Sequence, residues 1–493
     1  MTAATEDCVA ATATNSIIQG RVDALASVEL TVHPDSELAK TGRGEWIIWP
    51  GQGCRQEDLQ ALVENMPNDT RAVTHGHPER GGLCFFIMEG TREGVWQKLA
   101  MHRWSSTPKV ETDTAVHFDA QVARESDQLR TVGGLENWGL DRIDQRNDNL
   151  DDVFEPMSKT GGSGVDVYVM DTGIRTSHTE FGGRAVPKLE TFEGESKECK
   201  NTDEDCAEDA QGHGTYCAAI VGGKNAGVAP QATLHAVKVH DGTNGTAKSL
   251  YLAFDWLLSQ DLPVASTVFS MSLNLGDVVI FPPSLRSALT ETYDRGITTV
   301  LASGNHGSSF GGWVLHDKTA AAIQVGAVGK KDKEWESNGK RYDILAPGVG
   351  VQSAWITEEE SVWDNKKPGF VLQVVPSDTG KKTFDGTSAA APHVAGAAAL
   401  LLSEAKSRDE AFSPAAVKKT LMKHGSDFCK GKIACHDKRV MLYIGRQDKY
   451  NYEINWMQEA EWARPGATKR SGSNTLPPWG TYEADKDVHL VLR

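Results

Sequence analysis

The sequence lacks the features that would direct it to a nucleic acid, to an anionic membrane or across a bilayer. Basic residues are outnumbered, since the formal net charge is −16 at pH 7, whereas nucleic acids and anionic lipids attract basic surfaces. No apolar run approaches the ~20 residues that a transmembrane helix needs. Residues 1–18 contain no basic segment followed by an apolar core, so no signal peptide is recognised there. We expect no nucleic-acid partner and no membrane span.

The chain has eight cysteines, and none of them has the spacing that is typical of zinc ligands. Cys199 and Cys206 enclose a short polar stretch, as do Cys429 and Cys435. Such stretches are the usual setting of small structural disulfides in secreted proteins, and metal binding is the alternative. We therefore expect a secreted or lumenal protein with disulfides.

What is present is the composition of a large globular protein. The chain has 493 residues, of which 39% are hydrophobic and 24% are charged, and 48 are glycines. These proportions exclude a disordered or a fibrous protein. The length is enough for two or three domains, one of them with a large core.

The N-terminal part of the chain predicts a small α+β domain over residues 44–116. Residues 1–43 show no sustained periodicity, so we expect disorder there, and residues 117–133 are expected to be a linker. Strands and helices alternate within the domain. The expected strands are 45–49, 84–88 and 109–116, and the expected helices are 56–66 and 91–101. We find no catalytic constellation in this domain.

Residues 134–445 predict an α/β domain with a doubly wound, mostly parallel sheet and helices on both faces. Short apolar runs rich in β-branched residues alternate there with helical patterns. Active sites on such sheets lie beyond the carboxyl ends of the strands. The expected strands are 165–170, 233–239, 268–271 and 297–302, and the clearest expected helices are 247–260 and 284–295.

Ser388 is the candidate nucleophile. It lies in FDGTSAAAPHVAGAAALLL, residues 384–402, where small and apolar residues predict a buried helix that the serine opens. Backbone N–H groups and the positive end of the dipole at a helix N-terminus stabilise the negative oxygen that an attacking serine creates. The alternative is that Gly-Thr-Ser is only an N-cap.

Asp171 and His213 would complete a catalytic triad with Ser388. Asp171 ends a predicted strand before Thr-Gly, and His213 stands in Gly-His-Gly-Thr before a helix of small residues. Taken singly, the aspartate could be a turn residue and the histidine structural. Taken together, His213 would accept the serine proton as general base, and Asp171 would orient the imidazole.

Two further residues bear on this chemistry. Asn305 follows the strand at 297–302, where its side-chain amide could join the Ser388 backbone N–H in stabilising an oxyanion. Cys217 offers a rival hypothesis, the nucleophile of a cysteine protease, which the better serine constellation disfavours.

The chain resembles the subtilisin-like serine proteases, or subtilases, and is closest in its motifs to the proteinase K group. The motifs VDVYVMDTGI, GHGTYCAAIVGG, ASGNHG and GTSAAAPHVAGAAALLL stand in the order of that family, within residues 134–445. The resemblance implies a subtilisin-like fold. It also implies that residues 44–116 are a ferredoxin-like, inhibitor-type propeptide that is removed by self-cleavage.

The resemblance further implies two walls of a substrate pocket and one metal site. Asn274 departs from the family's usual glycine, which leaves the specificity of the pocket open. The implied pocket residues are Ser272, Leu273, Asn274, Ala302, Ser303 and Gly304. A structural calcium ion would be bound by the Ala320 and Ala322 carbonyls and the Asp343 carboxylate, unless Asp343 is a turn residue. The acidic run 203–209 is either a second cation site or a solvated face.

We therefore expect a serine endopeptidase, made as a self-processing, monomeric zymogen that acts on proteins or peptides. No cofactor is expected for the chemistry itself. The alternatives are a non-enzymatic relative that keeps the fold for binding, and an active fold held latent by an uncleaved propeptide. Residues 356–382 are expected to form a surface loop, and nothing predicts the role of residues 446–493.

Overall fold

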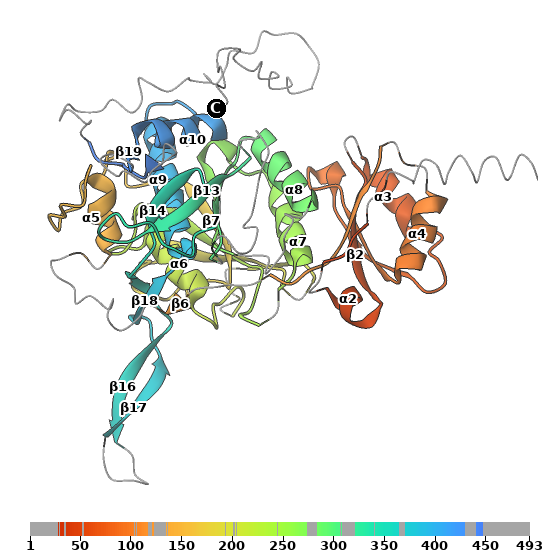
Figure 1. Ribbon diagram of the computed structural model, residues 1–493, viewed down its shortest axis with the longest axis horizontal. Coiled ribbons are helices and arrows are strands. Elements are labelled where there is room, and N and C mark those ends of the chain that lie inside the picture. Colours follow the sequence, from red (N-terminus) through yellow and green to blue (C-terminus); the bar gives the residue numbers. More distant parts are fainter. Residues whose placement is uncertain are drawn as a thin grey trace, which may run out of the picture.

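The structure consists of two packed units, a small five-stranded one and a large ten-stranded one (Figure 1). It is a computed structural model that describes residues 28, 30–33, 36–51, 54–102, 104, 106–116, 121–122, 135, 137–192, 194–200, 203, 205–243, 245–273, 283–305, 307, 321–339, 341–363, 370–428 and 440–446. Within these residues, no helix is both long enough and apolar enough to cross a membrane.

The small unit has the strand order of a ferredoxin-like βαββαβ domain, with one additional edge strand. Its strands lie in the order β1-β5-β2-β4-β3. The elements are β1 (Leu30–Thr31), α2 (Glu37–Thr41), β2 (Gly44–Trp49), α3 (Gln56–Val63), β3 (Arg71–His75), β4 (Phe86–Gly90), α4 (Arg92–Met101) and β5 (Lys109–Thr112). A single 3-10 turn, Pro78–Arg80, precedes β4. The predicted α+β domain is therefore present.

Its sheet has two apolar faces because side chains alternate along each strand. Trp46 and Ile48 of β2 pack under α3 and α4. Ile47 and Trp49 face the other way, into a core that they share with the α7 and α8 helices of the large unit. Figure 1 shows this sheet lying between the two helix pairs. The small unit thus docks on the large one through a buried hydrophobic face.

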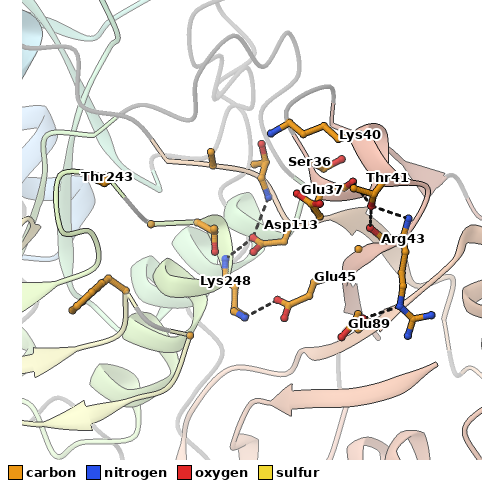
Figure 2. A pocket seen from close by; sticks show the side chains of 17 residues that line it. Ser36, Glu37, Lys40, Thr41, Arg43, Glu45, Glu89, Asp113, Thr243 and Lys248 are labelled. Carbon is orange, nitrogen blue, oxygen red and sulfur yellow. Dashed lines mark hydrogen bonds and ion pairs between the residues drawn. The ribbon is translucent and has the colours of Figure 1, made fainter. Parts of the chain in front are cut away.

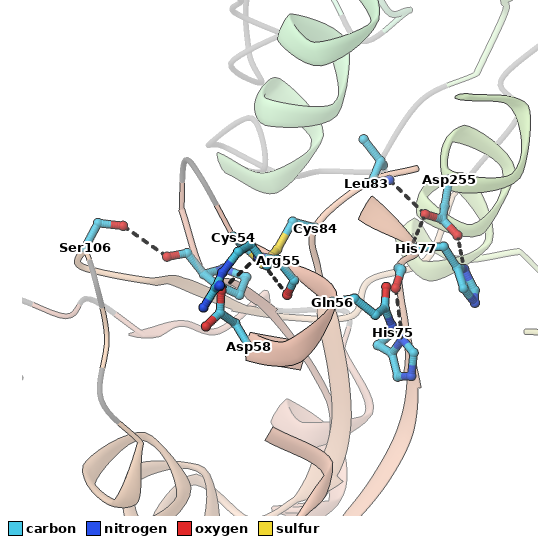
Figure 3. The surroundings of a disulfide bond; sticks show 12 residues. Cys54, Arg55, Gln56, Asp58, His75, His77, Leu83, Cys84, Ser106 and Asp255 are labelled. Carbon is cyan, nitrogen blue, oxygen red and sulfur yellow. Dashed lines mark hydrogen bonds and ion pairs between the residues drawn. A yellow bond between two sulfur atoms is a disulfide. The ribbon is translucent and has the colours of Figure 1, made fainter. Parts of the chain in front are cut away.

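Two features of the small unit differ from expectation. Leu30–Thr31 pairs with β5, and α2 follows it with the Ser36 hydroxyl as its N-cap, so part of the segment 1–43 is ordered. Residues 1–27 lie outside the described part. Cys54 and Cys84 form a disulfide that the sequence did not predict, near the contact with the large unit (Figure 3).

The large unit contains a doubly wound sheet in the order β19-β20-β14-β13-β12-β11-β7-β10-β8-β9. From β20 to β8 all neighbouring strands are parallel, and the two edge strands are antiparallel, which confirms the predicted α/β fold. The strands are β7 (Asp166–Asp171), β8 (Ala185–Glu190), β9 (Lys197–Glu198), β10 (Thr233–Lys238), β11 (Thr267–Met271), β12 (Thr298–Ala302), β13 (Ile323–Val328), β14 (Ile344–Pro347), β19 (Ser426–Asp427) and β20 (Val440–Met441).

Helices cover both faces of this sheet, as its alternating side chains require. Val167 and Val169 of β7 contribute to the core on the side of α6 and α9, whereas Tyr168 and Met170 contribute to the core under α7 and α8. The central strands are therefore apolar on both faces, as in buried parallel sheets. The helices are α5 (Trp138–Asp144), α6 (His213–Gly222), α7 (Ala247–Leu258), α8 (Pro283–Asp294), α9 (Thr387–Ser407) and α10 (Pro414–His424).

A long hairpin projects from the large unit where the sequence predicts a surface loop (Figure 1). Its strands are β16 (Thr357–Trp363) and β17 (Phe370–Pro376), which pair in antiparallel register. At its base, β15 (Val351–Ala354) and β18 (Lys381–Asp385) form a three-stranded sheet with β6 (Gln121–Val122). The expected C-terminal extension lies outside the described residues beyond Arg446.

Candidate functional site

Asp171 and His213 are brought together at the carboxyl ends of the parallel strands. Asp171 is the last residue of β7, and His213 is the first residue of α6, so this helix begins earlier than predicted and includes the Gly-His-Gly-Thr histidine. Both side chains are buried, and His213 Nδ1 lies 2.7 Å from Asp171 Oδ1. Burial alone would lower the pKa of His213, but the Asp171 carboxylate raises it well above its ordinary value.

Asp209 fixes the turn that carries His213, and sequence reasoning missed it. Its carboxylate accepts hydrogen bonds from the Gly212 N–H (2.7 Å), from the Thr215 N–H (2.8 Å) and from the Thr215 hydroxyl (2.6 Å). It also accepts one from the Thr172 hydroxyl (2.8 Å), next to Asp171. The carboxylate therefore caps α6 and links the two turns that hold the pair. An aspartate just ahead of a helix start was the available signal.

Gly212 is required where the chain enters α6. Its φ is 106°, a conformation that L side chains rarely adopt. A Cβ at this position would also lie 2.7 Å from the Trp355 ring. Trp355 packs with Tyr216 and Phe384 in a small aromatic cluster, and the Tyr216 hydroxyl donates to the Val351 carbonyl at 2.7 Å. This cluster supports the histidine turn from outside the main core.

Ser388 is the second residue of α9 and lies near the Asp171–His213 pair. Its hydroxyl donates to the Ser272 carbonyl at 3.1 Å, and the Ser272 hydroxyl donates to the Ser388 carbonyl at 3.0 Å. The Cys217 sulfur connects the two regions, because it lies 3.4 Å from the Ser388 carbonyl oxygen and 3.8 Å from His213 Nδ1. The structure thus gathers three distant segments at one end of the sheet.

Cys217 does not suit the role of nucleophile. Its side chain is buried, and burial raises the pKa of its thiol despite the neighbouring histidine. A thiol is nucleophilic only as the thiolate. The geometry therefore favours Ser388 over the rival cysteine hypothesis.

Asn305 lies beside the start of α9 with its amide in a fixed orientation. Its Oδ1 accepts hydrogen bonds from the Thr387 N–H at 2.9 Å and from the Thr387 hydroxyl at 2.7 Å. Since the oxygen is held in this way, the amide NH₂ is the end that can donate further. A Cβ built on Gly386 would lie 3.3 Å from the Asn305 nitrogen, which places that nitrogen close to the Ser388 turn.

The two expected pocket segments follow neighbouring strands of the sheet. Ser272 and Leu273 come directly after β11 and are buried, and Asn274 lies outside the described residues. Ser303 follows β12 and donates from its backbone to the Val325 carbonyl at 3.0 Å. The Gly304 N–H donates to the Thr387 hydroxyl at 3.2 Å. Both segments therefore contact the surroundings of Ser388.

The N-terminal chain pairs with the large unit at two places. The Val116 N–H donates to the Gly245 carbonyl, and the Ala247 N–H donates to the Thr114 carbonyl, each at 2.9 Å. Further along the chain, β6 pairs with β18, which leads into α9. Sequence reasoning did not identify Gly245 as a partner of the N-terminal chain, because a single extended residue has no sequence signal.

The predicted calcium ligands do not form an open oxygen site. The Lys418 ammonium donates to the Ala322 carbonyl at 3.1 Å and lies 2.7 Å from Asp343 Oδ2. Ala320 lies outside the described residues. A cation of the protein itself therefore contacts the two described oxygen ligands, and this donor set does not fit a calcium ion.

The other predictions about metals and disulfides have mixed outcomes. Cys199 and Cys206 form the predicted disulfide, whereas Cys429 and Cys435 lie outside the described residues. Within the acidic run 203–209, Asp209 is buried and accepts hydrogen bonds at the start of α6, whereas Asp205 is exposed. In the described part of the chain, the one cluster of side chains spaced for a metal is Asp171, His213 and Cys217, the site itself.

Several curated proteins resemble this chain. It is 31% identical to "Alkaline serine exoprotease A" of Vibrio alginolyticus over 320 residues, which cover 64% of this chain and 51% of that protein. It is 35% identical to "Extracellular serine proteinase" of Thermus sp. (strain Rt41A) over 268 residues, 54% of this chain and 56% of that protein. It is 32% identical to "Cuticle-degrading serine protease" of Arthrobotrys oligospora over 315 residues, 63% of this chain and 67% of that protein. The chain thus spans about half the length of the first two relatives.

A solved structure titled "Crystal structure of a cold adapted subtilisin-like serine proteinase" aligns with a TM-score of 0.49 at 29% identity, covering 63% of this chain and 99% of that one. The match to a family model covers more than half of this chain. Residues 162–439 match the Subtilase family and include Asp171, His213, Asn305 and Ser388. The strand order, the site and this match agree, and the chain belongs to the subtilase family.

Proposed function

We propose that this subtilase is a secreted or lumenal serine endopeptidase, made as a zymogen that cleaves itself. The observation that carries the proposal is the buried Asp171–His213 pair, 2.7 Å apart, beside a serine at the N-terminus of a buried helix. The serine protease names and the word "extracellular" among its relatives support it. Subtilase chemistry needs no cofactor, so every step falls to groups of the chain.

In the first step, His213 accepts the Ser388 proton while the serine oxygen attacks the substrate carbonyl carbon. A rotation about the Ser388 Cα–Cβ bond moves the hydroxyl from the Ser272 carbonyl to the imidazole. The resulting imidazolium is stabilised by Asp171, whose carboxylate accepts a hydrogen bond from the Nδ1–H group and stays ionised. His213 then donates its proton to the leaving amine, which leaves the acyl group on Ser388. Water, deprotonated by the same histidine, releases the acid.

The negative oxygen formed in each half of the reaction needs donors that are already in place. The Asn305 NH₂ and the Ser388 backbone N–H are the candidates, since Thr387 holds the asparagine by its oxygen. Preorganised donors of this kind lower the barrier because they need no rearrangement as the charge develops.

Proteins and peptides are the proposed substrates because the segment that leads into α7 already pairs with extended backbone of the N-terminal chain. Thr114 and Val116 pair antiparallel with residues 245–247, as an added β-strand would. Backbone pairing of this kind is independent of side chains. The sequence preference is therefore assigned to the pocket walls at Ser272–Leu273 and Ala302–Gly304.

The small unit is proposed to be the inhibitory propeptide, attached to a monomeric enzyme. Its C-terminal strand leads directly into the segment on the substrate edge, and β6 then continues beyond the site. Its docking is reinforced by Lys248, which pairs with Glu45 at 2.6 Å and whose backbone N–H donates to Asp113 at 2.9 Å (Figure 2). A chain bound along this edge blocks access for other substrates.

The test compares the full chain with a Ser388→Ala variant by intact mass and by labelling with a fluorophosphonate. The wild-type chain should cut itself after Val116 and before β6, and label at Ser388. The variant should do neither, because loss of the nucleophile costs about 10⁶-fold, the value that holds for subtilisin itself. If added protease removes the small unit and the wild-type domain still fails to label, the protein is a non-enzymatic subtilase. Labelling only after such removal would instead indicate a latent enzyme without self-processing.

A further inference from the structure

Lys418 lies where the resemblance to the proteinase K group places a calcium ion. Ala322 directly precedes β13, Asp343 directly precedes β14, and Lys418 projects from α10 toward both. The ammonium donates to the Ala322 carbonyl at 3.1 Å and pairs with Asp343 Oδ2 at 2.7 Å. The Lys418 and Asp343 side chains are only 17% and 27% exposed. The contact is therefore largely shielded from water.

The ammonium satisfies the same oxygen atoms that a calcium ion would use. Calcium binds carbonyl and carboxylate oxygens at about 2.3–2.6 Å and needs six to eight of them. A positive nitrogen already in contact with two of these oxygens occupies the position of the ion and repels a second cation. The lysine supplies three N–H donors, so one side chain can hold both oxygens.

The carboxylate does not depend on a metal for its position. The Asp343 N–H donates to the Gln324 carbonyl at 2.9 Å, and the Asp343 carboxylate oxygen Oδ2 accepts a hydrogen bond from the Gln324 N–H at 2.9 Å. This pairing continues into the β13–β14 ladder, where Val325 lies opposite Ile344. The strand register thus presents the carboxylate to α10.

The helix that carries Lys418 is held in place by its packing on the core. Val417 and Leu421 of α10 are fully buried against the same core as α9 and the sheet. Lys418 is adjacent to Val417, and the helix start is capped by the Ser413 hydroxyl. The helix therefore delivers the ammonium to the ends of two strands without a change in its packing.

We propose that the Lys418 ammonium replaces a structural calcium ion at Ala322 and Asp343, so that this subtilase is independent of calcium at this position. The lysine ties α10 to the β13 and β14 ends, the same segments that a calcium ion would join. Removing its charge while keeping its bulk should leave two oxygens without a cation and convert the position into a calcium site.

The experiment measures the Tm of the full chain in the Ser388→Ala background, which prevents self-digestion, with EDTA and with millimolar CaCl₂. Three variants are compared in that background: Lys418→Met, Asp343→Asn, and Lys419→Met as a control that removes an exposed charge from the same helix. In EDTA, Lys418→Met should lower the Tm by about 3–8 °C. Calcium, but not magnesium, should then raise the Tm of this variant by roughly 5 °C.

Two comparisons decide the matter. The proposal requires that calcium shifts the Tm of the parent and of Asp343→Asn equally, since neither binds the ion at this position. It is overturned if Asp343→Asn reduces the calcium response of the parent, or if Lys418→Met gains no calcium response beyond that of Lys419→Met. If Lys418→Met folds only when calcium is present, recovery of folded protein in calcium replaces the Tm as the readout and supports the proposal.

Discussion

The two units hold their important polar groups in different ways. Around Asp171 and His213, all charged groups belong to the large unit. Asp209 links the turns that carry Asp171 and His213 through buried hydrogen bonds. Between the small and large units, charged groups lie at the edge of an apolar face, beside a hollow of about 740 Å³ that is lined by both units. The first arrangement fixes geometry within one unit, whereas the second joins the two units across a core to which both contribute.

The difference is clearest in two aspartates. Asp209 is 1% exposed and receives its hydrogen bonds from within the large unit. Asp255 of α7 is also buried, but it receives hydrogen bonds from the His77 and Leu83 N–H groups of the small unit, each at 2.8 Å, and lies 2.7 Å from His77 Nδ1 (Figure 3). One carboxylate supports the site, and the other supports the docking.

The largest effect is expected for Asp209→Ala. This change leaves several buried donors without an acceptor, so we expect the free energy of unfolding to fall by about 3–5 kcal/mol. The turn that carries His213 should move as well, so fluorophosphonate labelling of the wild-type background should slow. Chemical denaturation of the Ser388→Ala chain gives the stability, and Asp205→Ala, exposed in the same acidic run, is the control. Equal effects of the two substitutions would contradict the capping role.

A smaller and more local effect is expected for Asp255→Ala. Two backbone N–H groups and one imidazole lose their acceptor, but His77 is 40% exposed, so we expect docking to weaken by about 2 kcal/mol. In the Ser388→Ala chain, hydrogen exchange should accelerate at amides 77–85 and remain unchanged in α6 and α9. Asp255→Asn retains an acceptor for both N–H groups, so its hydrogen exchange at amides 77–85 should be intermediate between the parent and Asp255→Ala. Unchanged protection at 77–85 would show that the apolar face alone holds the small unit.

Features that have a local sequence pattern were predicted well from the sequence. Short apolar runs that alternate with helical patterns predicted the doubly wound sheet. Glycine-flanked polar residues at strand ends and helix starts predicted Asp171, His213, Asn305 and Ser388 as neighbours. Contacts that depend on two distant segments were missed. Asp209 looked like one member of a charge run, and Cys54 and Cys84 had no shared local pattern. The calcium ligands were placed by resemblance, whereas Lys418 comes from a helix far along the chain.

The smallest expected effect is a dependence of docking on pH. The hydrogen bond to Asp255 raises the pKa of His77 above its ordinary 6.5, despite burial and the nearby Arg80, and Glu79 acts in the same direction as Asp255. The contribution of this pair is therefore complete below pH 6.5 and is lost as the pH rises through the raised pKa. Burial raises the pKa of Asp113 to about 6, with Glu45 adding to the rise and Lys248 opposing it.

Asp113 acts with the same sign, because its contribution is complete below pH 3.8 and is lost as the pH rises through about 6. Docking should thus weaken as the pH rises from 5 to 8, by roughly tenfold. Protection factors of amides 77–85, corrected for the intrinsic exchange rate at each pH, measure this in the Ser388→Ala chain. His77→Gln should reduce the dependence of these protection factors on pH above pH 6.5, and Asp113→Asn should reduce it near pH 6. A protection factor that increases with pH would mean that groups other than His77 and Asp113 determine the pH dependence of the interface. The difference between the site and the contact of the two units would then rest on the apolar face alone.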